Sequence, residues 1–194
     1  MRTAEPTAPP VVPPDRIRIH GAQPVPRTVR QDPRGFLMET LRSDDRTVDG
    51  ARFRMSYTSL TVPGQFRDVD RWHVHRVQTD RFVVLLGEMT LALLDTRSGS
   101  PTEGWLDVVR FPGVPWEAPS SDPARELPAH LVPIPPGVLH SLGNLASRPF
   151  LYQNYPSELY DPSDEGRIPF ASVPVASIGG PFSWDLLRAG RRGP

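Results

Sequence analysis

The sequence contains no cysteine. Thiol catalysis, cysteine-ligated metal centres and disulfide frameworks are therefore excluded, because each needs a sulfur that the chain does not carry. A metal site in this protein has to be built from oxygen and imidazole donors. With 194 residues, the chain is long enough to bury a hydrophobic core as one domain without a covalent cross-link.

The sequence also lacks an excess of charge, since 22 basic residues balance 22 acidic ones. A neutral chain does not create the positive field that attracts nucleic acid or an anionic membrane surface, so we expect neither as a partner. It has no apolar run near the roughly 18–20 residues of a membrane helix, and its first residues lack the apolar segment of a secretion signal. These absences predict a cytoplasmic protein.

Proline is the residue in excess, with 25 copies. Residues 6–26 are especially rich in proline, which supports neither a helix interior nor a central strand. We therefore expect an extended or disordered arm over residues 1–26, a single domain over residues 27–187 and a solvated tail over residues 188–194. The proline-rich segment 112–128 is expected to be a loop at the rim of the domain.

The rest of the chain contains short apolar segments with alternating or β-branched residues, which are typical of strands. Gly87 and Glu88 separate two of these segments and predict the turn of a β-hairpin. No long segment repeats its apolar residues with a helical period, although residues 182–187 are expected to form a short closing helix. The pattern predicts an all-β sandwich or barrel. The expected strands span residues 52–62, 82–86, 89–94, 106–111, 130–134 and 150–155.

Histidines and one aspartate form the main candidate site. His73 and His75 are two residues apart, so in an extended strand both imidazoles project from one face. Asp80 follows them, and His140 lies far along the chain. Imidazole and carboxylate donors suit one divalent transition metal, such as iron, manganese, nickel, cobalt or zinc, with coordination positions left open. The alternative is a set of ordinary polar residues on the inside of a barrel.

The spacing of these residues resembles the two sequence motifs of the cupin family. The first motif, HxH followed by an acid and a glycine, runs from His73 to Gly87, with Asp80 where the family usually has glutamate and Arg67 where it usually has glycine. The second motif matches Pro135–Asn144. The resemblance implies a cupin fold, which is a double-stranded β-helix or jelly-roll barrel. In metal-binding cupins the matching positions are the ligands, which nominates His73, His75, Asp80 and His140.

Further segments resemble one cupin family in particular, the dTDP-4-dehydrorhamnose 3,5-epimerases, and together they cover most of residues 28–185. The resemblance implies metal-free chemistry, in which a histidine removes a proton next to a ketone and a tyrosine protonates the opposite face. By position in the motifs, the base falls on His73 and the acid on Tyr152. The matching segments are Asp32–Phe36, Glu39, Asp95–Trp105 and Ile134–His140.

Three positions depart from the epimerase pattern. The aspartate that orients the base in that family would follow Ile168, where this chain continues with Pro169–Ser172, so we expect no orienting carboxylate. A lysine and an arginine at the diphosphate site are replaced by Asp80 and Asp70. Two anions in place of two cations are expected to repel a nucleotide diphosphate.

Three hypotheses for the function therefore stay open. The first is a mononuclear-metal cupin enzyme that performs oxygenation, isomerisation or lyase chemistry on a small organic molecule. The second is a metal-free epimerase or ketoisomerase of a dTDP-linked 4-dehydro-6-deoxysugar, since the related 3,4-ketoisomerases also carry an HxH pair without a metal. The third is a non-catalytic barrel that binds a metabolite. The resemblance also implies a homodimer, and the expected substrate-binding residues are Arg34, Glu39, Arg71, Trp72 and Asn144.

Overall fold

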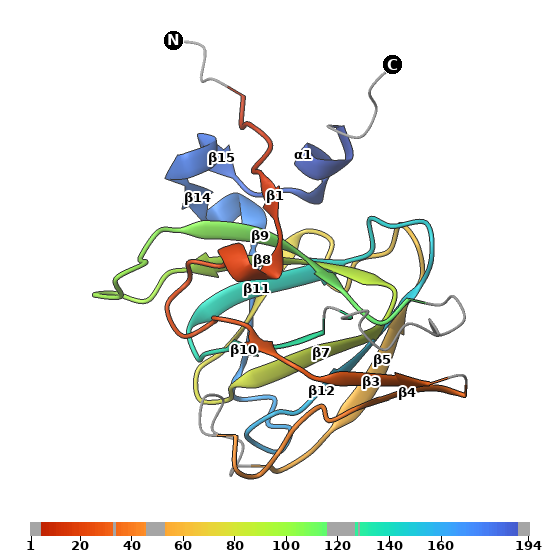
Figure 1. The fold of residues 1–194 in the computed structure, drawn as a ribbon. Helices are drawn as coiled ribbons and strands as arrows, with labels where there is room; N and C mark the ends of the chain where they lie inside the picture. Colours follow the sequence, from red (N-terminus) through yellow and green to blue (C-terminus); the bar gives the residue numbers. More distant parts are fainter. Residues whose placement is uncertain (1–4, 33, 46–52, 116–126, 128, 190–194) are drawn as a thin grey trace.

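The computed structural model of the protein describes residues 5–32, 34–45, 53–115, 127 and 129–189. Two β-sheets face each other around the main hydrophobic core (Figure 1). The predicted all-β fold of the cupin type is therefore confirmed.

The larger sheet has six strands in the order β1-β9-β8-β11-β6-β13, and every neighbouring pair except β1 and β9 is antiparallel. Its strands are β1 (Val11–Val12), β9 (Leu106–Pro112), β8 (Glu88–Asp95), β11 (Val138–Gly143), β6 (Arg71–His75) and β13 (Glu165–Pro169).

The smaller sheet has five antiparallel strands in the order β2-β10-β7-β12-β5. Apolar side chains that alternate along both sheets fill the space between them, which is the burial that the alternating sequence pattern predicts. The strands are β2 (Val25–Pro26), β10 (His130–Ile134), β7 (Asp80–Leu86), β12 (Phe150–Asn154) and β5 (Tyr57–Thr61). Two small sheets add β3 (Val29–Asp32), β4 (Gly35–Met38), β14 (Pro174–Val175) and β15 (Gly180–Pro181).

The β-hairpin predicted at Gly87 and Glu88 is wrong. The strands on either side of this turn, β7 and β8, belong to different sheets, so the turn carries the chain across the core. Gly87 has a φ angle of +77°, and a Cβ atom there would lie 2.4 Å from the carbonyl oxygen of Pro149. Glycine is therefore required at this corner for its conformation and for its small size.

The other expected strands agree with the structure apart from their ends, and the first of them shortens to β5. Three strands that carry site residues, β6, β11 and β13, are absent from the strands predicted by apolar pattern. The sequence of β13 is Glu-Gly-Arg-Ile-Pro, which has little of the β-branched and aromatic character on which the prediction depended. Its pairing with β6 comes from the tertiary structure.

The described part of the N-terminal segment packs against the barrel and includes β1 and a short 3-10 helix, Pro14–Arg16. β1 pairs with β9, and the side chains of Ile17, Ile19 and Ala22 are buried in the main core. Arg18 secures this segment, because its backbone N–H and its guanidinium each donate to the carboxylate of Asp107 at 2.7 Å. Most of the rim loop expected at residues 112–128 lies outside the described residues, as does most of the tail.

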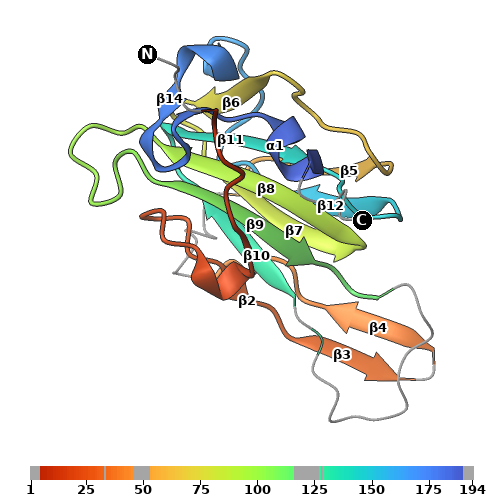
Figure 2. The ribbon, with the colours of Figure 1, turned by 90° about the horizontal axis from the view of Figure 1, so that it is seen from above.

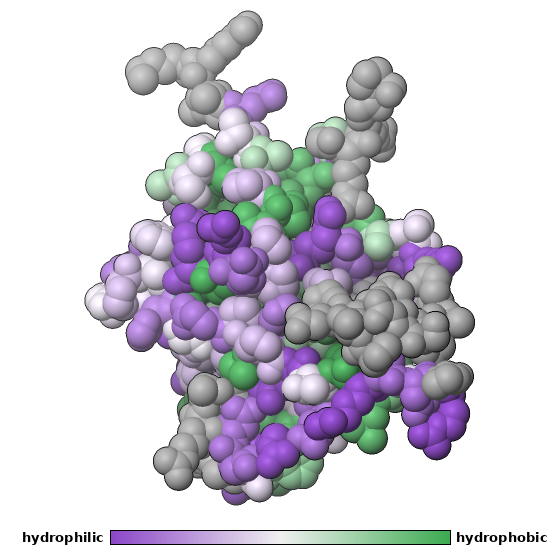
Figure 3. Space-filling model, in the orientation of Figure 1, coloured by the Kyte–Doolittle hydropathy of each residue, from purple (hydrophilic) through white to green (hydrophobic). Residues whose placement is uncertain are grey.

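The C-terminal helix is confirmed as α1 (Trp184–Ala189). A second core, rich in aromatic residues, lies between the outer face of the six-stranded sheet and the segments that end in α1. Figure 3 shows that the apolar residues visible on this side of the molecule gather mainly around β1, β15 and α1. No helix in the described part of the chain is long and apolar enough to cross a membrane.

Candidate active site

A pocket of about 330 Å³ opens between the two sheets, and both sheets and their connections line it. The six-stranded sheet contributes His73, His75, His140, Ser141, Leu142, Glu165 and Arg167. The five-stranded sheet contributes Tyr57, Asp80, Phe82 and Tyr152, and the connections contribute Met55, Arg67, Asp68, Gln78 and Tyr160.

Three histidines form one wall of the pocket because their strands are neighbours. His73 and His75 project from the same face of β6, as the HxH spacing predicts. On β11, His140 lies directly opposite His73 in the strand register. The ring centroid of His73 is 4.7 Å from that of His75 and 5.0 Å from that of His140.

Asp80 faces this wall from β7 of the five-stranded sheet, and its side chain is 3% exposed. Its Oδ1 accepts hydrogen bonds from the amides of Gln78 at 2.9 Å and Asn154 at 2.7 Å. Its Oδ2 is 3.4 Å from His140 Nε2 and 3.5 Å from His75 Nε2. Burial alone would raise the pKa of Asp80, but the hydrogen bond and charge of His140, supported by His75 and Asn154, lower it below its usual value of 3.8. Asp80 is therefore an internal anion.

His140 is the counter-ion of Asp80. Its Nδ1 is 3.2 Å from the carbonyl oxygen of Val138, and its Nε2 faces the Asp80 carboxylate. Since both neighbours are acceptors, both ring nitrogens need a proton, and this geometry suits an imidazolium. A buried carboxylate paired with a buried imidazolium avoids leaving either charge uncompensated.

The predicted metal ligands His73, His75, Asp80 and His140 share this pocket, but their donor atoms do not fit a metal ion. The Nε2 atom of His75 lies 3.0 Å from the amide nitrogen of Gln78, and both oxygens of Asp80 already face donors. Among the residues that the structure describes, no group of three or more histidine, aspartate or glutamate side chains can hold a metal ion. The nitrogen and oxygen atoms of His75, Asp80 and His140 instead contact polar groups of the protein itself.

His73, unlike its neighbours, keeps a nitrogen without a hydrogen-bond partner. Its Nε2 is buried and lies 3.2 Å from Glu165 Oε1, without the alignment of a hydrogen bond. Burial lowers the pKa of His73 from 6.5 to about 3, and the neighbouring side chains of His140 and His75 act in the same direction. His73 is therefore a neutral imidazole at physiological pH, which is the form that accepts a proton.

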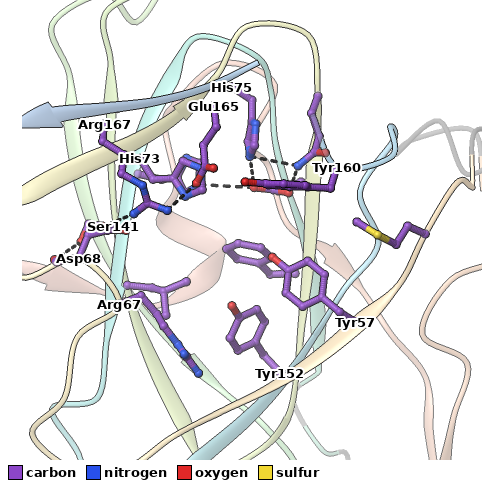
Figure 4. A pocket seen from close by; sticks show the side chains of 16 residues that line it. Tyr57, Arg67, Asp68, His73, His75, Ser141, Tyr152, Tyr160, Glu165 and Arg167 are labelled. Carbon is purple, nitrogen blue, oxygen red and sulfur yellow. Dashed lines mark hydrogen bonds and ion pairs between the residues drawn. The ribbon is translucent and has the colours of Figure 1, made fainter. Parts of the chain in front are cut away.

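The sequence predicts no carboxylate that orients His73, because none follows Ile168, yet Glu165 lies 3.2 Å from His73 Nε2. β13 pairs with β6 so that Arg167 lies opposite His73 and Glu165 opposite His75. Arg167 donates to Glu165 Oε1 and to Asp68 Oδ1, each at 2.5 Å, and so holds Glu165 beside the imidazole (Figure 4). The carboxylate comes from a position before Ile168, whereas the epimerase pattern places it after that residue.

Two tyrosines face the histidines from the five-stranded sheet (Figure 4). The rings of Tyr57 and Tyr152 meet edge to face, with centroids 6.4 Å apart. Burial raises the pKa of both phenols, so both hydroxyls keep their protons near neutral pH. The pocket therefore holds a proton acceptor on one wall and proton donors on the other.

Comparison with known proteins shows the family of this chain. The chain is 34% identical to the "Probable low-salt glycan biosynthesis epimerase Agl13" of Haloferax volcanii, over 78% of this chain and 88% of that protein. This chain belongs to the same epimerase family. No family model matches the sequence.

Solved structures from other organisms share the fold of this epimerase family member. A dTDP sugar isomerase from Desulfovibrio desulfuricans has a TM-score of 0.66 and 25% identity, and the match covers 86% of this chain and 92% of that one. The dTDP-6-deoxy-D-glucose-3,5-epimerase of Legionella pneumophila, solved with dTDP-4-keto-L-rhamnose, has a TM-score of 0.59 and 21% identity, over 80% of this chain and 75% of that one.

In this epimerase family member, several residues expected to bind substrate lie away from the pocket. Trp72 is fully buried on the other face of β6, where it packs against Phe170 and Phe182. Asn144 is also fully buried, and its amide donates to the carbonyl oxygens of Thr61 and Arg148, each at 2.9 Å. Trp72 lies outside the pocket because alternation along β6 places it on the face opposite His73. Asn144 directly follows β11.

The remaining expected binding residues are at the surface of the described chain. Arg71 forms an ion pair with Asp70, 2.7 Å away. Arg34 bonds to Asp32 in the turn of the β3–β4 hairpin, and Glu39 follows that hairpin. None of the five lines the pocket of this chain.

Sequence reasoning missed several residues that complete the site, namely Tyr57, Arg67, Gln78, Asn154, Asp164, Glu165 and Arg167. Gln78 carries the clearest signal, since it lies between the two halves of the first cupin motif. The others come from strands and loops whose neighbours are fixed only by the sheet order.

Proposed function

We propose that this protein is a metal-independent epimerase or isomerase of a nucleotide-linked 4-keto-6-deoxysugar. The observation that carries the proposal is the neutral imidazole of His73 facing the protonated phenol of Tyr152 across one pocket. Removal of a proton next to a ketone needs a base on one side of the sugar ring, and inversion needs an acid on the other.

The proposed reaction is a pair of proton transfers. His73 takes the proton from the carbon next to the keto group, and the electron pair moves onto the ketone oxygen as an enolate. The neighbouring His140 imidazolium lowers the energy of this negative charge. Tyr152 then protonates the carbon from the opposite face, and its phenolate regains a proton from solvent. Glu165 stabilises the positive charge that His73 acquires.

Arg67 is the proposed contact for the diphosphate. It lines the pocket and donates to two uncharged acceptors, Ser59 Oγ and the carbonyl oxygen of Leu60. Of the two anions expected to repel the diphosphate, Asp70 lies outside the pocket in an ion pair with Arg71, and Asp80, which lines the pocket, is paired with His140. The repulsion of a nucleotide diphosphate that the sequence predicts is therefore weaker in the folded protein.

Incubation with dTDP-4-keto-6-deoxy-D-glucose in heavy water tests this function. We expect the wild-type protein to incorporate deuterium next to the keto group and to invert that carbon, and to do so equally after dialysis against EDTA. His73→Asn should slow the exchange by about 10²–10⁴-fold. Tyr152→Phe should retain exchange but lose inversion, because the base alone can return a proton only to the face from which it came. Mass spectrometry measures exchange, and NMR measures configuration.

Tyr155→Phe is the matched control, because the Tyr155 hydroxyl bonds to Thr40 outside the pocket. It is expected to react like the wild type. A wild-type protein that leaves both the deuterium content and the configuration of the sugar unchanged would contradict the proposal, and so would activity that EDTA abolishes and added metal restores.

A further inference from the structure

His75 has a fixed orientation that the proton transfers of His73 and Tyr152 do not use. It lines the pocket beside His73, and its side chain is 10% exposed. Its Nδ1 lies 3.2 Å from Asp164 Oδ2. An ionised carboxylate only accepts hydrogen bonds, so Nδ1 carries a proton, and the neighbours of Nε2 decide whether that nitrogen keeps its lone pair.

Asp164 is held by the backbone that follows β6. Its Oδ1 accepts hydrogen bonds from the N–H groups of Arg76 at 2.9 Å and Val77 at 2.8 Å, and its Oδ2 accepts one from Gln78 at 3.1 Å. Partial burial opposes ionisation, but these three bonds outweigh it and lower the pKa of Asp164. The carboxylate is therefore a fixed acceptor for the imidazole.

The contacts of the other ring nitrogen, Nε2, indicate the same tautomer of His75. Its Nε2 is 3.0 Å from the side-chain amide nitrogen of Gln78, which also donates to Asp80 at 2.9 Å. An N–H donor facing Nε2 matches a lone pair and would clash with a proton. Asp80 Oδ2 is also 3.5 Å from Nε2, but the Gln78 amide nitrogen is closer, and Gln78 cannot turn its amide oxygen toward Nε2 without losing its bond to Asp80. The two hydrogen-bond partners, Asp164 and Gln78, therefore select the tautomer with the proton on Nδ1. Because Gln78 lines the pocket, a substrate group can replace its amide at Nε2.

The geometry points to His75 as a second proton acceptor in this pocket, with Asp164 as its positioning residue. This inference rests on the proposed function, which supplies the proton. Nε2 takes a proton from a C–H or O–H group of the sugar, Nδ1–H stays bonded to Asp164, and the imidazolium returns the proton to the product. No oxidant or further reactant is consumed. The adjacent carboxylates Asp164 and Glu165 thus serve His75 and His73, respectively.

Asp164→Asn tests the inference while preserving the shape of the side chain. The amide oxygen can keep the bonds from Arg76 and Val77, while the amide nitrogen replaces Oδ2 and donates to His75 Nδ1. The imidazole proton is then driven to Nε2. With dTDP-4-keto-6-deoxy-D-glucose as the probe, we expect kcat to fall by about 10²–10⁴-fold, the scale of a wrong-tautomer substitution in a serine protease triad, with KM little changed.

Heteronuclear NMR of the histidine side chains provides a readout that is independent of activity. We expect a proton on Nδ1 of His75 in the wild type and on Nε2 in Asp164→Asn, with the signal assigned by its loss in His75→Gln. Asp161→Asn is the matched control, since Asp161 bonds to the N–H of Ser163 at 2.8 Å in the same loop. It should keep the wild-type spectrum and rate.

A wild-type His75 protonated on Nε2 would overturn the inference. An Asp164→Asn variant with the altered tautomer and an unchanged kcat would overturn it as well. A wild-type protein that does not turn over the probe would overturn the proposed function, and in that case the NMR comparison still decides whether Asp164 positions His75.

Discussion

At the scale of single residues, the site depends on charges that compensate one another inside the barrel. Asp80 and His140 are both 3% exposed, and each is paired with the other. His73 is different, because burial and the neighbouring histidines keep it neutral. The same residues that suggest a metal centre from their spacing therefore include an ion pair, Asp80 with His140, and a neutral imidazole, His73.

The lowered pKa of His73 predicts a pH dependence of stability. The unfolded chain binds a proton at His73 below about pH 6.5, whereas the folded protein does so only near pH 3. Since the unfolded state binds more protons between these values, the free energy of unfolding should fall as the pH falls, by about 1–2 kcal/mol between pH 7 and pH 5. Urea denaturation at both values measures it.

His73→Asn isolates this contribution, because it removes the titrating group and leaves the other histidines in place. The difference between the unfolding free energies at pH 7 and pH 5 is expected to shrink by about the same 1–2 kcal/mol in the variant. An equal difference in the two proteins would show that His73 is not held neutral in the fold.

At the scale of elements, β6 connects the pocket to the C-terminal segment. One face of β6 carries His73 and His75, and the other presents Trp72 to the aromatic core that α1 covers. Within this core, Trp184 is 1% exposed, and its Nε1 donates to the carbonyl oxygen of Asp68 and to Ser141 Oγ, each at 3.2 Å. Packing on the outer face thus helps to fix the strands that line the pocket.

Trp184→Ala is therefore expected to lower the free energy of unfolding by about 3–5 kcal/mol, the usual cost of truncating a buried tryptophan. Chemical denaturation measures the loss. Trp105→Ala is the matched control, because Trp105 is 43% exposed and contacts Arg18 through its ring face. That change should cost about 1 kcal/mol or less, and similar losses in the two variants would contradict the role given to the aromatic core.

At the scale of the whole molecule, the β3–β4 hairpin extends away from the barrel (Figure 2). Phe36 is 41% exposed and Leu37 60% exposed on this hairpin. Apolar side chains on a projecting hairpin are suited to contact with a second copy of the chain. The homodimer that the family resemblance implies therefore stays a prediction, with this hairpin as the expected contact.

Light scattering after size exclusion tests the dimer. We expect a mass of twice 21.6 kDa for the wild type and of 21.6 kDa for Leu37→Arg, because a charge in an apolar contact is costly to bury. Val77→Arg is the control, since Val77 is 66% exposed away from the hairpin. A wild-type monomer, or a dimer that Leu37→Arg leaves intact, would exclude the hairpin contact.

Much of the fold follows from local sequence. Alternating apolar segments identified β7, β8, β9, β10 and β12, because burial of one face of a strand imposes a period of two residues. The same period placed His73 and His75 on one face of β6. The prediction that Trp72 binds substrate did not apply this period. Trp72 is one residue away from His73 in β6, so its side chain lies on the opposite face of the strand.

The sequence by itself determined the fold class, the shared face of His73 and His75, and the absence of thiol chemistry. Only the tertiary structure decided how the site's polar atoms are paired. Glu165 reaches His73 because β13 pairs with β6, and Asp80 reaches His140 because the two sheets face each other. The pairing of strands far apart in the chain decides whether a carboxylate lies beside a hydrogen-bond donor or a metal. The spacing of residues along the chain does not contain this information.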